Sequence, residues 1–340
     1  MVLKKLHRNY LSPFRKILLT KISHFIALLI LVWILPANSE TSDVNGWELV
    51  WSDEFDGEKL DVSKWTYDVD CWGGGNNERQ CYTDKEENVK LENGFLKIIA
   101  LKKRSKGYAV PQIARDGYIP NPTSSKKFEK KRQAYTSGRI STRGKQAWQY
   151  GRFEARMKLP MGQGMWPAFW MLPEEWRYGG WAASGEIDIM EAINLSASCP
   201  ECEVGREDRV YGTLHFGGAA PNNIHKGENI SLSAPVDGFH VYTLEWSEGR
   251  MDWYVDGQHF STLTSADWST IPEKGNPSAH APFDHPFHMI LNLAVGGKWP
   301  EENNDVGYIT QSFPKQFVVD WVRVYECGSD KKTGKGCHKN

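Results

Sequence analysis

The sequence predicts an all-β protein built from two antiparallel sheets packed face to face. Apolar residues recur at every second position along many short segments, and Gly-rich turns separate these segments. No long stretch keeps the period of a helix, and no internal repeat is apparent. No linker rich in Pro, Ser and Gly divides residues 45–326, so we expect one domain.

The individual strands follow from this alternation. In residues 151–159, "GRFEARMKL", every second side chain is apolar, which predicts a strand with one face in the core. Residues 240–264 predict three strands, joined by a turn at 247–249 and by a tight hairpin at Asp256-Gly257. Residues 287–295 and 317–326 are apolar enough to predict strands buried on both faces.

Residues 1–39 are predicted to be a signal peptide. They contain Lys and Arg but no acid, then an apolar run from Phe25 to Leu35, then small residues before a cleavage site after Ser39. The apolar run is short for a membrane span, and an uncleaved anchor is the alternative. We assign residues 40–326 to a single folded domain and residues 327–340 to a C-terminal tail, and we expect a secreted protein, extracellular or periplasmic.

The charge of the remaining chain limits its partners. Residues 40–340 carry 35 Lys and Arg against 42 Asp and Glu. This acidic balance predicts that neither nucleic acid nor an anionic membrane is a partner. The Lys and Arg of residues 126–132 form a local basic stretch, which its Ser, Pro and Asn neighbours indicate to be an ordinary exposed loop. We expect a monomer.

All six cysteines follow the predicted signal peptide, and export permits disulfides. Three local pairs are the simplest of the connectivities that six cysteines allow. One of these pairs, Cys327 with Cys337, would hold the tail. The "CPEC" of residues 199–202 is also compatible with zinc binding or redox chemistry, but it lacks a second Cys/His pair and a βαβ context.

Three carboxylates crowd the segment "SGEIDIMEAIN", residues 184–194. On a regular strand Glu186 and Asp188 share one face, whereas Glu191 falls on the opposite, isoleucine-rich face. An unpaired carboxylate in the core is costly. A one-residue β-bulge near Met190 would shift the phase and place all three carboxylates on one open face.

The simpler alternative for this cluster is an edge strand whose acids are solvated. That alternative has no need of a bulge, and clustered like charges repel each other. Crowded carboxylates are typical of sites with shifted pKa values. We therefore interpret the cluster as catalytic.

Tryptophan is the second functional signal. Most of the 15 tryptophans are expected in the core, but Trp166 and Trp170 share a strand face and Trp181 directly precedes the acid cluster. Indole faces stack on the C–H faces of sugar rings, while acids and amides bind the hydroxyls. His215 is either a hydrogen-bonded core residue or part of the site. The glycines that flank it favour the second alternative, because glycine in a strand often marks a place where a ligand or another backbone approaches closely. We predict these sugar-binding residues: Trp166, Trp170, Trp181, Trp299, His215 and Asn77.

An ordered series of motifs from Trp47 to Glu326 resembles glycoside hydrolase family 16, most closely its laminarinase branch, the endo-β-1,3-glucanases. The series includes "WSDEFDG", "GGNNERQCYT", "GEIDIMEAIN", "GTLHFGG", "HMILNLAVGGKWPE" and "VVDWVRVYE". The resemblance implies a β-jelly-roll sandwich with the substrate cleft across its concave sheet. It also adds Arg139, in the matching stretch "YTSGRISTRG", to the substrate-binding residues.

The resemblance further implies retaining hydrolysis. Glu186 would be the nucleophile, Glu191 the general acid/base, and Asp188 the residue that holds a proton and steadies the nucleophile. The spacing of the acids is compatible with this mechanism. Retention needs two carboxyl groups about 5–5.5 Å apart, and neighbouring positions on a bulged strand can supply them. Asp188 between them makes full ionisation of all three unfavourable and helps to separate their pKa values.

No catalytic cofactor is implied, but a structural Ca²⁺ is. Its ligands would be Glu54, the backbone carbonyl of Gly94, and Asp320. Asp320 is predicted to share its strand face with three valines, and so needs a partner, which a salt bridge to an Arg would supply equally well. The sequence departs from the family pattern at Cys81, where many relatives have Tyr. A disulfide from Cys81 to Cys71 would tie the adjacent loop over the cleft entrance.

The expected function is that of a secreted, retaining endo-β-1,3-glucanase that cleaves laminarin-type glucan, with mixed-linkage β-1,3-1,4-glucan as a further substrate. The E-x-D-x-x-E spacing is similar to that of laminarinases, agarases and carrageenases, and unlike the E-x-D-x-E of lichenases. One alternative is a non-catalytic β-glucan-binding protein, which the intact carboxylates disfavour. The others are a hydrolase of another polymer, such as agarose, and transglycosylation.

Overall fold

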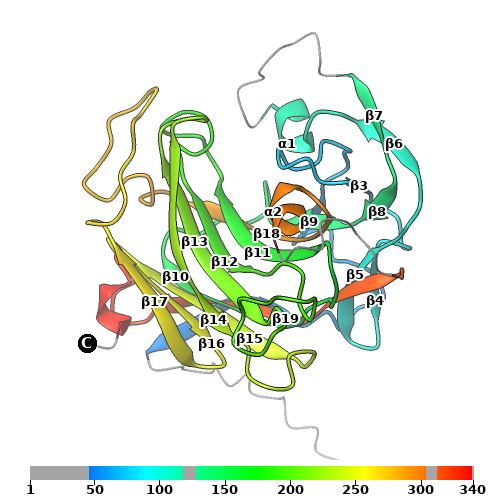
Figure 1. Cartoon of the computed structure of the whole chain (residues 1–340). Helices are drawn as coiled ribbons and strands as arrows, with labels where there is room; N and C mark the ends of the chain where they lie inside the picture. Colours follow the sequence, from blue (N-terminus) through cyan, green and yellow to red (C-terminus); the bar gives the residue numbers. More distant parts are fainter. Residues whose placement is uncertain (1–45, 118–127, 304–311, 339–340) are drawn as a thin grey trace, which may run out of the picture. The chain divides into compact units, whose positions relative to one another are not determined.

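The structure, a computed structural model, describes residues 46–117, 128–303 and 312–338. The chain divides into two units, residues 1–40 and 41–340, and the described residues all belong to the second. Two large antiparallel sheets form the two layers of this second unit (Figure 1). The predicted all-β jelly-roll class is confirmed. The predicted signal peptide lies outside the described residues.

Sheet A has eight strands, and β19 is its centre. In order they are β17 (Gln258–Thr264), β16 (Arg250–Val255), β15 (His240–Ser247), β10 (Gly151–Lys158), β19 (Lys315–Cys327), β5 (Phe95–Ala100) and β4 (Val89–Glu92), with β1 (Trp47–Asp53) also paired to β19.

Sheet B has seven strands and carries the acid cluster on β12. In order they are β14 (Asn223–Ser231), β13 (Arg209–Gly217), β12 (Glu186–Glu191), β11 (Met165–Pro173), β18 (Phe287–Val295), β9 (Arg139–Ser141) and β2 (Thr66–Tyr67).

Two small sheets and three short helices complete the described residues. The small sheets are β3 (Gln80–Tyr82) with β8 (Tyr135–Ser137), and β6 (Ser105–Tyr108) with β7 (Lys130–Gln133). The helices are α1 (Gln112–Arg115), α2 (Lys298–Glu302) and the 3-10 turn η2 (Lys335–Cys337). None of the helices described here is long and apolar enough to cross a membrane.

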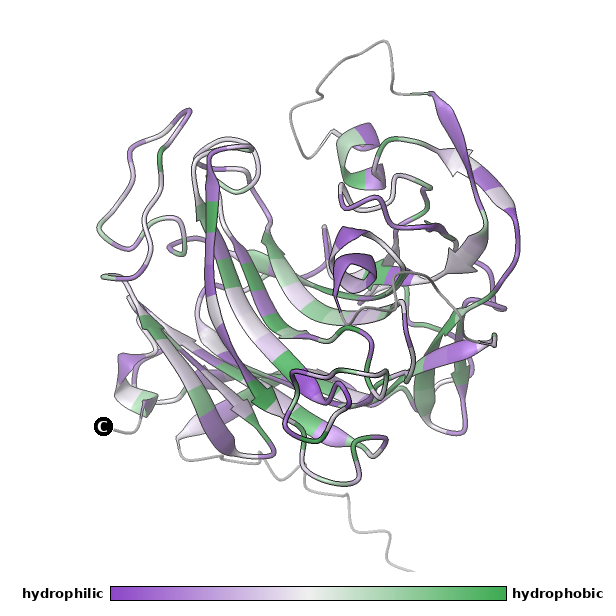
Figure 2. Ribbon diagram, in the orientation of Figure 1, coloured by the Kyte–Doolittle hydropathy of each residue, from purple (hydrophilic) through white to green (hydrophobic). Residues whose placement is uncertain are grey.

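The core lies between the two sheets, as the alternation predicts. Phe153, Ala155 and Met157 on β10 are fully buried, and polar neighbours alternate with them on the other face. Figure 2 shows the same alternation of apolar and polar residues along strands of both sheets. The three strands predicted within residues 240–264 are β15, β16 and β17, and every residue of β18 is buried.

The prediction for residues 317–326 is wrong in one respect. β19 is buried on one face only, since Val318, Trp321 and Arg323 on the other face are half-buried. In addition, Asp320 is an extra residue between Val319, opposite Met157, and Trp321, opposite Arg156. This bulge changes the phase of the strand. Its buried positions are therefore Phe317 and Val319 before the bulge but Val322 and Val324 after it. Asp320 itself is half-buried and does not share the face of Val322 and Val324, contrary to the prediction.

The predicted bulge in β12 is present. Phe169 of β11 lies opposite Met190, and the next residue, Trp170, lies opposite Asp188, so Ile189 is the extra residue. The pairing of β12 with β13 shifts at the same place, between Asp188 and Glu191. Ile187, Ile189 and Met190 all remain buried in the core. The following residue, Glu191, is thereby returned to the face of the other two acids.

A tryptophan from the opposite sheet packs against this bulge. The indole N–H of Trp253, on β16, donates a 2.9 Å hydrogen bond to the backbone carbonyl of Asp188. Gly212, the β13 residue opposite the bulge, leaves room for the indole, because a Cβ there would lie 2.4 Å from Trp253 Cδ1. Sheet A thus holds the irregular part of sheet B through one fully buried side chain.

The three predicted local disulfides are all formed, namely Cys71–Cys81, Cys199–Cys202 and Cys327–Cys337. The Cys199–Cys202 disulfide leaves "CPEC" without the thiolates that zinc binding needs. In the tail, Cys337 packs with Trp47 and Tyr325 as well as with Cys327. The described tail residues consequently pack against sheet A.

Replacing Gly212 with Ala tests the packing at the bulge. We expect Gly212→Ala to lower the free energy of unfolding by about 1–3 kcal/mol, because the added methyl group forces the buried indole of Trp253 to move. The measurement is urea unfolding followed by tryptophan fluorescence. Gly180→Ala is the control, since a Cβ there meets its nearest atoms at 3.7 Å. Equal stability of the two variants would contradict the proposed fit.

Candidate active site

The three carboxylates lie on one face of sheet B, as predicted. Glu186 is paired across the sheet with His215 of β13, and Asp188 with Trp170 of β11. Glu191 lies beyond the bulge, opposite Ala168 and Tyr211. The site is therefore built from three adjacent strands, and its acids come from the central one.

Glu186 has an indole donor and a cation as neighbours. The Nε1–H of Trp181 donates a 2.7 Å hydrogen bond to Glu186 Oε2, and His215 Nε2 lies 3.8 Å from Glu186 Oε1. Burial and the nearby charge of Asp188 raise the pKa of Glu186 to about 7, against the opposing effects of these two neighbours. Glu186 is therefore ionised in a substantial fraction of molecules near neutral pH.

Glu191 has its own indole donor. The Nε1–H of Trp166 donates a 2.9 Å hydrogen bond to Glu191 Oε1. Burial, followed by the charge of Asp188, raises the pKa of Glu191 well above its ordinary value. Burial and the charge of Asp188 thus favour the protonated form of Glu191, as the role of general acid requires.

Asp188 and His215 form an ion pair beneath the two glutamates. His215 Nε2 lies 3.3 Å from Asp188 Oδ2, and the Asp188 side chain is 2% exposed. Burial alone would lower the pKa of His215, but Asp188, Glu186 and Glu191 together raise it to about 10. His215 is therefore a cation at neutral pH, which offsets one of the crowded negative charges.

The platform tryptophan Trp170 is held from two sides. Its Nε1–H donates a 2.7 Å hydrogen bond to Asn292 of β18, and the guanidinium carbon of Arg139 lies 4.8 Å from the ring centroid. Arg139 is buried and paired with Asp68 at 3.0 Å. The structure therefore places Arg139 behind the platform, where it supports Trp170.

A buried polar network continues from Asn292 to the loop of residues 71–81. Asn292 Nδ2 donates to the Tyr82 hydroxyl at 3.1 Å, and Glu78 Oε2 accepts a 2.6 Å hydrogen bond from Gln80. Asn77, at the tip of this loop, is exposed and has a positive φ of 61°. No hydrogen bond or ion pair joins Asn77 to the carboxylates among the described residues, so its contact with sugar stays a prediction.

The remaining predicted platforms differ in exposure. Trp299, on α2, is half-buried and packs edge-on against Trp166 and Tyr211, with ring centroids 5.2 and 5.1 Å apart. Trp166 is only 9% exposed. Trp166 therefore does not offer an open face as we predicted; it orients the acid/base instead. Trp181 is half-buried, and its ring lies 5.5 Å from that of His215.

Sequence reasoning missed two residues of the site region, Asn292 and Tyr211. Asn292 could have been found, because it is the one amide in the otherwise apolar strand "FHMILNLAV". Tyr211 gave no signal, since its role depends on the contact with Trp299 from a distant part of the chain.

The predicted calcium ligands are engaged with arginines. Glu54 accepts two hydrogen bonds from Arg323, at 3.0 and 2.8 Å, and Asp320 forms an ion pair with Arg156. The alternative that we considered for Asp320, a salt bridge to an Arg, is thus the one observed. Two carboxylates that already face guanidinium groups do not form an open oxygen cluster for Ca²⁺.

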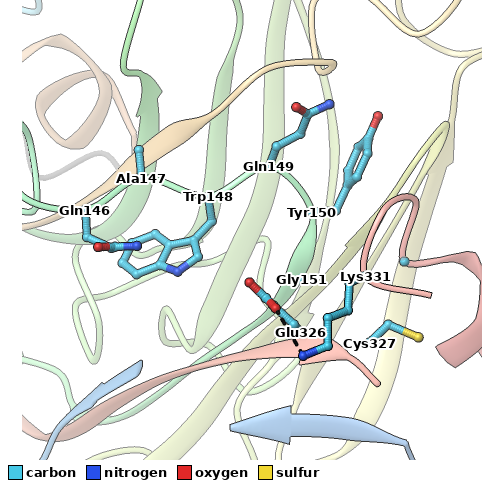
Figure 3. A pocket seen from close by; sticks show the side chains of 10 residues that line it. Gln146, Ala147, Trp148, Gln149, Tyr150, Gly151, Glu326, Cys327 and Lys331 are labelled. Carbon is cyan, nitrogen blue, oxygen red and sulfur yellow. Dashed lines mark ion pairs between the residues drawn. The ribbon is translucent and has the colours of Figure 1, made fainter. Parts of the chain in front are cut away.

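A separate hollow lies next to sheet A (Figure 3). None of the predicted site residues lines it. Lys331 Nζ lies 3.8 Å from Glu326 Oε2 within it. Its lining comes from the segment before β10, the end of β19 and the tail: Gln146, Ala147, Trp148, Gln149, Tyr150, Gly151, Glu326, Cys327, Lys331 and Gly334.

The fold and the paired glutamates define a glycoside hydrolase, and comparisons give the family. A family profile of the GH16 domain of β-porphyranases A–D matches residues 47–327. Glucan endo-1,3-β-glucosidase A1 of Niallia circulans is 40% identical over 296 residues, 83% of this chain and 38% of that protein. The β-glucanase of Rhodothermus marinus is 38% identical over 313 residues, 88% of this chain and 92% of that protein.

A solved structure agrees with these relatives. The laminarinase from Rhodothermus marinus superposes with a TM-score of 0.62 at 36% identity, covering 82% of this chain and 97% of that one. The chain belongs to glycoside hydrolase family 16 and is similar to its laminarinases. The predicted family and enzyme class are confirmed.

The two indole donors predict effects on different limbs of the pH profile. We expect kcat/KM to rise as Glu186 ionises and to fall as Glu191 ionises. Because the two groups interact, the two apparent pKa values of the profile belong to the pair. Trp181→Phe removes a donor that favours the Glu186 carboxylate, so the acidic limb should move up by about one pH unit. Trp166→Phe should instead move the basic limb up, because the pKa of Glu191 rises further.

The measurement is kcat/KM against pH for the wild type and both variants. Each variant is the control for the other, because both lose one indole N–H. The assignment fails if both variants move the same limb, or if neither limb moves.

Chelation tests the observed ion pairs. We expect Tm to be the same in excess EDTA and in millimolar CaCl₂, because Arg323 and Arg156 neutralise Glu54 and Asp320. Differential scanning calorimetry is the measurement, with excess MgCl₂ as the ionic-strength control. A fall in Tm on adding EDTA, reversed by Ca²⁺, would restore the calcium prediction.

Proposed function

We propose that this chain is an endo-acting, retaining β-1,3-glucanase. The observation that carries the proposal is the bulge in β12, which places Glu186, Asp188 and Glu191 on one face, where burial and the charge of Asp188 raise the pKa values of both glutamates. Two carboxyl groups in different protonation states at one pH are what double-displacement hydrolysis requires.

In the first step Glu186 attacks the anomeric carbon. A bond forms between its carboxylate oxygen and C1 while the bond from C1 to the glycosidic oxygen breaks. Glu191 gives its proton to that departing oxygen, so the leaving group departs as a neutral alcohol. The cation of His215 lies close to Glu186 and Asp188, and it keeps the nucleophile ionised beside a second carboxylate.

In the second step Glu191, now a carboxylate, takes a proton from water. The water oxygen bonds to C1 on the face opposite Glu186, the ester bond breaks, and the Glu186 carboxylate is restored. Two inversions give net retention. A sugar hydroxyl in place of water would give transglycosylation by the same route.

Support for a β-1,3-glucan substrate comes from the relatives and from the site. The similar proteins carry the names glucan endo-1,3-β-glucosidase, β-glucanase and laminarinase. Trp170 and Trp181 are half-buried, so parts of both rings remain open to stack on sugar. Mixed-linkage β-1,3-1,4-glucan is included in the proposal as a further substrate.

A second candidate is hydrolysis of another polymer, porphyran or agarose. The family profile that matches residues 47–327 is the one for β-porphyranases, and this observation supports that candidate independently of the glucanase names. Carboxylate positions alone do not separate the two, because subsite shape decides which polymer fits. A purely glucan-binding protein would have no use for the shifted pKa values of Glu186 and Glu191.

The proposal includes secretion and a monomeric state. The three disulfides support an oxidising destination. The acidic balance of residues 40–340 supports a partner other than an anionic membrane.

Reducing-sugar release from laminarin, mixed-linkage glucan, agarose and porphyran tests the proposal. We expect preference for laminarin, and we expect Glu186→Gln to lower kcat by at least about 10³-fold, because the amide cannot attack C1. Asn229→Gln, on exposed β14, is the control and should keep full activity.

Each alternative gives a different result. Release of reducing sugar from porphyran or agarose alone would agree with the mechanism but contradict the proposed substrate. Equal binding of laminarin by the wild type and Glu186→Gln, without cleavage by either, would mean a recognition protein.

A further inference from the structure

The β6–β7 hairpin carries a cationic face. The sequence analysis treated residues 126–132 as an exposed loop, but residues 130–133 form a strand paired with Ser105–Tyr108. Within residues 102–117 and 128–133 there are eight Lys and Arg and two acids, Asp116 and Glu129. This concentration contrasts with the acidic balance of residues 40–340.

Two of these cations face each other across the hairpin. Lys106 lies directly opposite Arg132, and both side chains are exposed. Neither has an ion pair with an acid in the described part of the chain. Like charges that are directly opposite on paired strands destabilise the pair. The isolated protein therefore bears a repulsion that a bound anion would relieve.

A third and a fourth cation adjoin the same face. Side chains two apart on a strand share a face, so Tyr108 lies beside Lys106, and Lys130 beside Arg132. Lys130 Nζ lies 5.2 Å from the Tyr108 ring centroid, and the guanidinium carbon of Arg115 lies 4.1 Å from it. The Tyr108 ring thus holds two cations, Lys130 and Arg115, next to the Lys106–Arg132 pair.

The opposite face of the hairpin packs on the loop of residues 71–81. A Cβ on Gly107 would lie 2.7 Å from Cys71 Sγ, and Gln133 Nε2 donates a 2.9 Å hydrogen bond to the Glu78 carbonyl. Since side chains alternate along a strand, the face of Lys106 and Arg132 points away from this contact. The disulfide-tied loop therefore fixes the direction of the cationic face.

Helix α1 links the cationic face to the substrate site. Arg115 of α1 stacks on Tyr108, whereas Ile113 of α1 belongs to an apolar cluster against which Trp170 and Trp181 pack. The cationic face and the sugar platforms thus lie on two sides of one short helix. A polymer chain engaged at the platforms, or a second chain lying beside it, would pass near the cationic face.

We propose that the β6–β7 face, made of Lys106, Lys130 and Arg132 with Arg115 of α1 beside it, binds the sulfate or carboxylate groups of an anionic polysaccharide. This binding would be separate from catalysis and does not depend on which polymer is cleaved. A polysaccharide fits better than nucleic acid, because the patch is one short hairpin on an otherwise acidic chain and adjoins sugar platforms. A long polyanion would meet repulsion beyond the patch.

Affinity electrophoresis in gels that contain dextran sulfate, carboxymethyl dextran or neutral dextran tests the proposal. These α-linked polymers are not β-glucans, so retention does not report on the active site. We expect the wild type to be retarded by the charged polymers only, and less so as salt rises. Lys106→Ser with Arg132→Ser should raise the apparent Kd on the order of tenfold. Retardation by one charged polymer alone would identify sulfate or carboxylate as the group that binds.

Two double variants are the controls. Lys106→Arg with Arg132→Lys keeps the charges, and Lys59→Ser with Lys145→Ser removes two exposed charges elsewhere. Both should bind as the wild type, all variants should keep laminarin hydrolysis, and none should have a lower Tm than the wild type.

Three results would overturn the proposal. The first is unchanged retardation of the Lys106→Ser, Arg132→Ser variant, and the second is equal loss in the Lys59→Ser, Lys145→Ser variant. The third is tighter binding to duplex DNA than to dextran sulfate at the same salt, which would make nucleic acid the partner.

Discussion

One inter-sheet hydrogen bond, from the indole of Trp253 to the carbonyl of Asp188, supports the irregular strand on which the site depends. A bulge leaves backbone groups without their regular ladder partners, and a buried carbonyl without a donor costs about 1–3 kcal/mol. Trp253 supplies the donor from the opposite sheet, and Gly212 provides the space. The phase change that brings Glu191 beside Glu186 is therefore stabilised by the sandwich core.

The site uses tryptophan as a polar residue as much as an apolar one. Each catalytic glutamate accepts a hydrogen bond from its own indole, Glu186 from Trp181 and Glu191 from Trp166. An indole N–H can only donate, so it fixes a carboxyl oxygen without adding a titrating group. For both glutamates the raised pKa comes first from burial and then from the charge of Asp188, against the charge of His215 and the indole donor.

Away from the site, charges are arranged in two ways. On sheet A, the arginines Arg156 and Arg323 are paired with Asp320 and Glu54, so these acids need no further partner. On the β6–β7 hairpin, Lys106 and Arg132 face each other without an acid among the described residues. The first arrangement stabilises the fold, whereas the second lies on a hairpin that packs on the Cys71–Cys81 loop.

The sequence by itself determined the features that depend on residue spacing. The alternation in residues 151–159 fixed which face of β10 is buried, and the odd spacing of Glu186 and Glu191 required a bulge, because a buried unpaired carboxylate costs too much. The same reasoning failed for Asp320, since nothing local revealed that β19 also has a bulge. Only the tertiary structure decided which distant residues meet. Trp253 reaches a carbonyl 65 positions away, and Trp170 reaches an amide 122 positions away. These contacts follow from the order of strands in the two sheets, and local periodicity carries no information about that order.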